Sequence, residues 1–159
     1  MIRKSLAAAA MFAAVQILAT GAAAEQVRFR GSFTLISVKN CIARYLGETF
    51  NSTFRPAGVG DNPDVTSLTQ LNQFSGDVYE LPGAAFPLNT WVTVKAWGFD
   101  NLHYRFRARI KITSQEPAVI DETTEFVSLT GLIRKMGNDP GLDGTCVAGF
   151  RGSYFRRVE

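Results

Sequence analysis

The chain has 159 residues, of which 46% are hydrophobic and 19% are charged. This length is enough for one hydrophobic core and excludes two domains of ordinary size. The formal net charge is only +3, so the overall charge does not identify a class of partner.

Residues 1–24 have the pattern of a bacterial signal peptide for Sec-type export. Arg3 and Lys4 precede an alanine-rich apolar stretch, and the small residues Ala22 and Ala24 mark a cleavage site. We therefore expect removal of residues 1–24, which leaves a single β domain over 25–159. That domain is expected in the periplasm or outside the cell, without a transmembrane span. Loss of Arg3 and Lys4 would lower the formal net charge to +1.

The two cysteines, Cys41 and Cys146, lie far apart in the sequence. In an oxidising compartment an even count favours a disulfide, and two cysteines allow one pairing. Such a long closed loop would stabilise the fold by roughly 4–5 kcal/mol in chain-entropy terms. The chain contains no CxxC pattern, and its only histidine is His103, so we expect no metal site and no cofactor.

Alternation of apolar and polar residues predicts an all-β fold. The predicted strands are residues 27–38, 49–55, 68–74, 77–81, 90–97, 102–113, 119–129 and 145–155, and only 132–136 would form a helical turn. Turn-forming residues separate these runs at short intervals. The sequence therefore predicts an antiparallel β-sandwich or small β-barrel of about 7–8 strands, closed by the disulfide.

One strand carries a strict electrostatic pattern. Arg105, Arg107, Arg109 and Lys111 would point to one face, with cations about 7 Å apart, while apolar residues point to the other. Such a ladder would bind a polyanion, such as an anionic envelope glycan or lipid. In an exported protein we expect no nucleic acid partner.

The alternative is an ion-paired, solvated face. A turn at residues 115–117 would place Lys111 opposite Asp121 and Arg107 opposite Glu125. Cross-strand pairs of opposite charge are ordinary sheet stabilisers, worth roughly 0.2–1 kcal/mol each. In that register the cations would be neutralised within the sheet.

No residue set has the partners that catalysis requires. The single histidine, His103, has no nearby nucleophile motif. The loop 138–144 is rich in Asn, Asp and Gly but lacks the ligand spacing of a calcium loop, so a turn explains it. We therefore expect a protein that is not an enzyme.

A short motif keeps a second function open. Ser75-Gly76-Asp77-Val78-Tyr79 resembles the S-G-x-x-Y motif of the small periplasmic lysozyme inhibitors, which are compact β-barrels with a disulfide. The resemblance covers five residues, and the lysine–glycine motif that accompanies it in those inhibitors is absent. It implies inhibition of a secreted hydrolase through Ser75, Gly76 and Tyr79.

Two further interpretations concern aromatic and apolar surfaces. Trp91 and Trp97 would share a strand face and, with Phe99, would stack on a sugar. An apolar cavity inside the predicted β domain would make the protein a carrier of a small ligand. The leading expectation is an exported, non-catalytic binding domain for an envelope or extracellular component.

Overall fold

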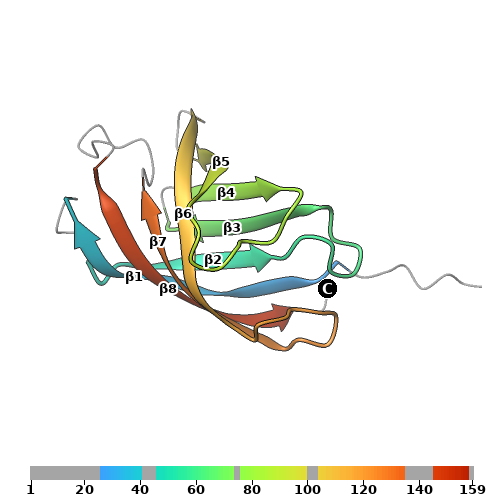
Figure 1. Ribbon diagram of the computed structural model, residues 1–159. Coiled ribbons are helices and arrows are strands. Elements are labelled where there is room, and N and C mark those ends of the chain that lie inside the picture. Colours follow the sequence, from blue (N-terminus) through green and yellow to red (C-terminus); the bar gives the residue numbers. More distant parts are fainter. Residues whose placement is uncertain (1–25, 41–45, 74–75, 100–103, 135–144, 158–159) are drawn as a thin grey trace, which may run out of the picture.

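The computed structural model describes residues 26–40, 46–73, 76–99, 104–134 and 145–157 (Figure 1). The regular structure of these residues is entirely β-strand. The strands are β1 (Arg28–Lys39), β2 (Thr49–Arg55), β3 (Val65–Leu71), β4 (Gly76–Pro82), β5 (Val92–Phe99), β6 (Tyr104–Glu116), β7 (Phe126–Arg134) and β8 (Val147–Arg157). The predicted all-β class is confirmed.

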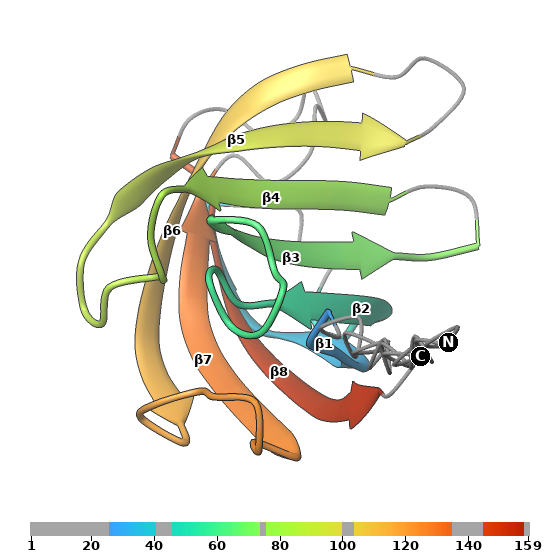
Figure 2. The ribbon, with the colours of Figure 1, turned by 90° about the vertical axis from the view of Figure 1, so that its right-hand side faces the viewer.

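The eight strands form one closed antiparallel barrel in sequence order. Each strand pairs with the next, and β1 closes the barrel on β8 from Arg28 opposite Arg157 to Lys39 opposite Val147. Figure 2 shows the strands side by side in this order around the wall. Of the two predicted architectures, the small barrel is the one that this chain adopts.

Alternate side chains of every strand fill the interior of the barrel. The buried apolar residues that line it include several large aromatic rings, and those of Phe33 and Phe150 stack at 4.5 Å between centroids. Phe54 and Tyr154 are a second interior pair, 5.9 Å apart. Small barrels close around their own side chains in this way, so the interior is a packed core in this region.

Two inward-facing glycines make room for this packing. A Cβ atom on Gly31 of β1 would lie 1.8 Å from the carbonyl oxygen of Ser153 on β8. A Cβ atom on Gly131 of β7 would lie 2.8 Å from the ring of Phe150. Glycine at such positions permits close approach of a neighbouring strand and strong curvature of the wall.

The seventh strand is displaced from its predicted position. Residues 117–125 form a loop, and β7 starts at Phe126 rather than near Val119. The cause is local: Asp121 Oδ1 accepts hydrogen bonds from the backbone N–H and hydroxyl of Thr123 and from the hydroxyl of Thr124. This turn takes the place of the expected strand pairing, and residues 132–134 are strand instead of a helical turn.

The predicted disulfide is not established by this structure. Cys146 is buried immediately before β8, whereas Cys41 lies outside the described residues. Cys146 directly precedes Val147, which pairs with Lys39 at the end of the ladder between β1 and β8. The Cys41–Cys146 pairing stays a prediction, which peptide mapping of the non-reduced protein tests.

Tyr154 is a buried titratable group in the core. Its hydroxyl lies 3.1 Å from that of Ser52, which also donates to the carbonyl oxygen of Thr69. Desolvation raises the pKa of Tyr154 well above its ordinary value of 10, and the hydrogen bond with Ser52 opposes this shift only in part. The side chain of Tyr154 is therefore a neutral phenol in the folded barrel.

This burial makes the barrel sensitive to alkali. Above pH 10 the unfolded chain loses the Tyr154 proton while the folded chain retains it, so stability is complete below pH 10 and falls as pH rises. We expect a loss of about 1.4 kcal/mol per pH unit from this one group. Urea unfolding at pH 9, 10 and 11 measures the slope, which should be shallower in Tyr154→Phe. Equal slopes in the two proteins would contradict the assignment.

Candidate polyanion-binding face

The four predicted cations of β6 lie on the outside of the barrel. Arg105, Arg107 and Arg109 are exposed and Lys111 is half-buried. The residues between them face the interior; Ala108, Ile110 and Ile112 are all buried. The predicted two-residue alternation of this strand is thus confirmed, and its cations lie in one outward row.

Neighbouring strands add two more cations to this row. Lys95 of β5 lies directly opposite Arg107, and Arg134 of β7 lies directly opposite Arg109. The six side chains define the cationic face: Lys95, Arg105, Arg107, Arg109, Lys111 and Arg134. Like charges opposite one another on adjacent strands repel, so this arrangement costs stability unless an anion compensates it.

The counter-charges predicted for β6 are not in place. Because the loop 117–125 delays the start of β7, Lys111 lies opposite Leu132 rather than Asp121. Arg107 lies opposite Lys95 on its β5 side, not opposite Glu125. Glu80 of β4 lies directly opposite Lys95, in the same cross-strand row as Arg107. No ion pair joins the cationic face to a carboxylate in the part of the chain that the structure describes.

Trp91, immediately before β5, lies against two members of the cationic face. The guanidinium carbon of Arg134 is 4.6 Å from the centroid of the indole, and that of Arg109 is 5.7 Å away. Both distances are in the range of cation–π attraction. Trp97 lies further along β5, opposite Val78 and Arg105. The side chain of Phe99, the third residue of the predicted sugar-stacking set, lies outside the described residues.

The other arginines considered from the sequence lie elsewhere on the wall. They belong to β1 and β8, and β7 lies between β8 and β6 in the wall. These arginines are Arg28, Arg30, Arg151, Arg156 and Arg157. Arg151, for example, lies between Thr34 and Thr130. These residues do not extend the cationic face directly.

The motif suggested by the lysozyme inhibitors is largely internal. Gly76 is buried at the start of β4, and Tyr79 is fully buried. The Tyr79 hydroxyl donates to Asp77 Oδ2 at 3.1 Å, and Gln70 Nε2 donates to the same oxygen at 2.9 Å. Ser75 lies outside the described residues. The Tyr79 side chain therefore contributes to the interior rather than to a contact surface.

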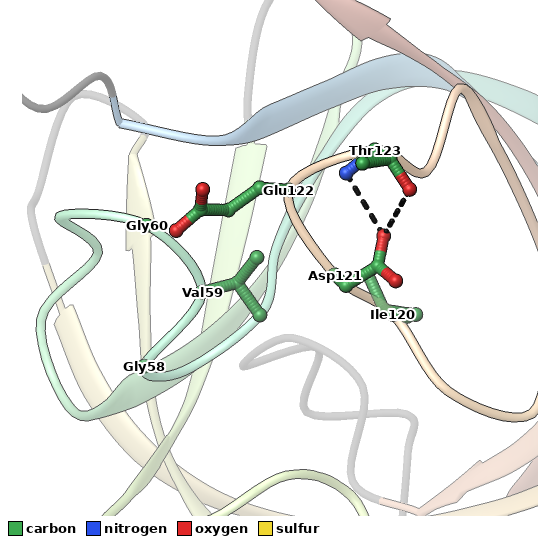
Figure 3. Close-up of a pocket in the computed structure, with 7 residues that line it drawn as sticks. All are labelled: Gly58, Val59, Gly60, Ile120, Asp121, Glu122 and Thr123. Atoms are coloured by element: carbon green, nitrogen blue, oxygen red, sulfur yellow. Dashed lines mark hydrogen bonds between the residues drawn. The ribbon is translucent and has the colours of Figure 1, made fainter.

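A surface depression lies at one end of the barrel, between the β2–β3 and β6–β7 loops (Figure 3). Its volume is about 380 Å³, and its lining residues are Gly58, Val59, Gly60, Ile120, Asp121, Glu122 and Thr123. Hydrogen bonds from the side chain and backbone of Thr123, and from Thr124, lower the pKa of Asp121. The charged lining is acidic, so this depression does not fit an anionic ligand.

The other candidate sites considered from the sequence are a metal site, His103 and the loop 138–144. No group of three or more His, Cys, Asp and Glu residues that could hold a metal ion occurs among the residues described. His103 and the loop 138–144 lie outside the description. Within the same limits, the structure contains no helix of the length and apolarity needed to cross a membrane.

Comparison with known proteins gives no match to a protein family, a curated protein or a solved structure. The fold and the surface therefore define the class of protein: an eight-stranded, up-and-down antiparallel barrel with a cationic face on β5, β6 and β7.

Two of the six residues of this face, Lys95 and Arg134, were not predicted from sequence. Lys95 alternates in step with Thr93 and Trp97, so its outward direction could have been read from β5 alone. Arg134 could not, because Gly131 and the apolar residues around it resemble a short helical turn. The contact between Trp91 and Arg134 joins segments more than forty residues apart and depends on the register of β5, β6 and β7.

Proposed function

We propose that this protein binds an anionic glycan of the bacterial envelope through the cationic face, without catalysis. The observation that carries the proposal is the register of β5, β6 and β7. It places Lys95 opposite Arg107 and Arg109 opposite Arg134 with no described ion pair to a carboxylate. A bound polyanion would relieve the repulsion between these cations.

The dimensions of the face favour a polymer over a single small anion. Cations on one strand face repeat about every 7 Å, and neighbouring strands add others at about 5 Å. From Arg105 to Lys111 the row extends for about 20 Å along β6. A glycan with phosphate or carboxylate groups at intervals would neutralise several of these charges at once.

The expected export of the chain agrees with this partner. Cleavage after Ala24 would deliver the barrel to the periplasm or the exterior, where lipopolysaccharide and acidic polysaccharides are present. Inhibition of a secreted hydrolase and transport of a small apolar ligand are the alternatives. No contact among the described residues favours either of them over binding at the cationic face.

Titration of the mature protein with lipopolysaccharide tests the proposal. We expect saturable binding that weakens roughly tenfold or more between about 20 and 200 mM NaCl, because exposed charges are screened by salt. Neutral dextran should not bind. Vesicles that contain phosphatidylglycerol distinguish binding to an anionic lipid surface from binding to a glycan. Binding to these vesicles without binding to lipopolysaccharide, or binding that does not depend on salt, would contradict the proposal.

A further inference from the structure

Trp91 holds two guanidinium groups of the cationic face close together. Arg109 and Arg134 come from adjacent strands and occupy directly opposite positions, so their side chains leave the sheet side by side. The guanidinium carbons of both residues lie within 5.7 Å of the centroid of one indole ring. The indole thus brings together two cations that would otherwise repel each other.

The charge of Arg134 has no acceptor in the described part of the fold. Its Nε atom is buried without a hydrogen-bond partner, and no described carboxylate pairs with its guanidinium group. Arg109 is exposed and likewise has no described ion pair. Buried or stacked arginines are ordinarily paired with an acid, so an external anion is the partner that this arrangement lacks.

We infer that Arg109, Arg134 and Trp91 form a two-arginine clamp for one phosphate monoester group. This inference rests on the proposed function and deepens it, because it names the group on the glycan that the cationic face recognises. The indole orients the two guanidinium groups, and their terminal nitrogens donate to the phosphate oxygens.

The chemistry of two arginines favours phosphate over a carboxylate. A carboxylate has two oxygens and only one negative charge, so it can accept from both guanidinium groups but compensates only one of their charges. A phosphate monoester offers three terminal oxygens and nearly two negative charges at neutral pH. It can therefore accept from both guanidinium groups and compensate both charges. A sulfate ester has the same shape but only one charge.

Fluorescence of the mature protein tests the clamp directly. The chain has two tryptophans, so Trp97→Phe leaves Trp91 as the sole reporter. The probes are methyl phosphate, methyl sulfate and acetate at low salt. We expect methyl phosphate to change Trp91 emission and to bind roughly tenfold more tightly than acetate, with methyl sulfate between them.

Charge-conserving substitutions separate the clamp from the general positive potential. Arg134→Lys keeps the charge but loses the planar fork and its stacking, so we expect roughly tenfold weaker binding of methyl phosphate. Arg151→Lys, at an exposed position of β8 outside the cationic face, is the matched control and should change little. Thermal unfolding of each variant verifies that the barrel remains folded.

The outcomes distinguish this inference from the proposed function. Equal affinity for the three probes, or equal losses in Arg134→Lys and Arg151→Lys, would overturn the clamp. If lipopolysaccharide still bound in a salt-dependent manner in that case, the cationic face would stand as a non-selective site. If the protein bound methyl phosphate selectively but did not bind lipopolysaccharide, the clamp would be supported and the proposed glycan partner would be overturned.

Discussion

Reversing two charges at the centre of β6 should abolish most of the affinity for lipopolysaccharide and leave the barrel intact. In Arg107→Glu/Arg109→Glu the cationic face loses two of its six cations and gains two anions. We expect binding at low salt to weaken by roughly thirtyfold or more, because the loss of two cations and the gain of two anions greatly reduce the positive potential of the face. The measurement is the same titration that tests the proposed function.

The same double variant should be at least as stable as the natural chain. Glu at position 107 would face Lys95, and Glu at position 109 would face Arg134, so two repulsive cross-strand pairs become attractive. Such pairs contribute roughly 0.2–1 kcal/mol each. Urea unfolding should therefore show an unchanged or higher midpoint. Loss of binding together with a stable fold would indicate that the repulsion is retained for function.

The control for this experiment is a double reversal on another strand. Arg151→Glu/Arg157→Glu makes the same change in net charge at two exposed positions of β8, which β7 separates from β6. We expect a reduction of only a few fold in affinity, from the overall charge of the protein. If both double variants weakened binding equally, net charge rather than the cationic face would explain the interaction.

The second large effect concerns the core. Phe150 is fully buried and stacks on Phe33 at 4.5 Å, and its ring occupies the space beside Gly131. Truncation to alanine removes this contact and leaves a cavity that the closed barrel cannot easily collapse. We expect Phe150→Ala to lower the free energy of unfolding by about 3–5 kcal/mol, which is a large part of the stability of a domain of this size.

A surface phenylalanine on the same strand supplies the comparison. Phe155 is 65% exposed and contacts Phe126 at 5.1 Å on the outside of the wall. Phe155→Ala should lower the free energy of unfolding by about 1 kcal/mol, the order of one exposed aromatic pair. Urea denaturation of both variants measures the difference. Similar losses in the two variants would contradict the inward direction of Phe150.

The sequence was sufficient to predict those parts of the fold that depend on local pattern. Strand β2 has its predicted bounds, Thr49–Arg55, and the alternation of β6 correctly separates its cations from its core residues. The choice between sandwich and barrel could not be predicted, because it depends on whether β1 reaches β8. That pairing joins the two ends of the domain and leaves no signal in either segment alone.

The errors at β7 have a common physical origin. Val119 and Ile120 are apolar and begin what looks like a strand, yet the side chain of Asp121 accepts three hydrogen bonds that close a turn. The true strand contains Gly131, which is tolerated because the ring of Phe150 fills the place of its side chain. Because β7 starts later than predicted, the cations of β6 lack the predicted acidic partners, and Arg109 lies opposite Arg134. A local error in the position of one strand thus altered the interpretation of the β6 face.

Closure of the barrel by its first and last strands also constrains how the chain folds. The ladder between β1 and β8 contains eleven residue pairs, from Arg28 with Arg157 to Lys39 with Val147. None of these hydrogen bonds can form until the end of the chain is present, and contacts of such long sequence separation slow folding. A chain that lacks its last strand would therefore remain an open sheet. Closure of the barrel wall, which the pairing of β1 with β8 completes, thus becomes the last step of its assembly.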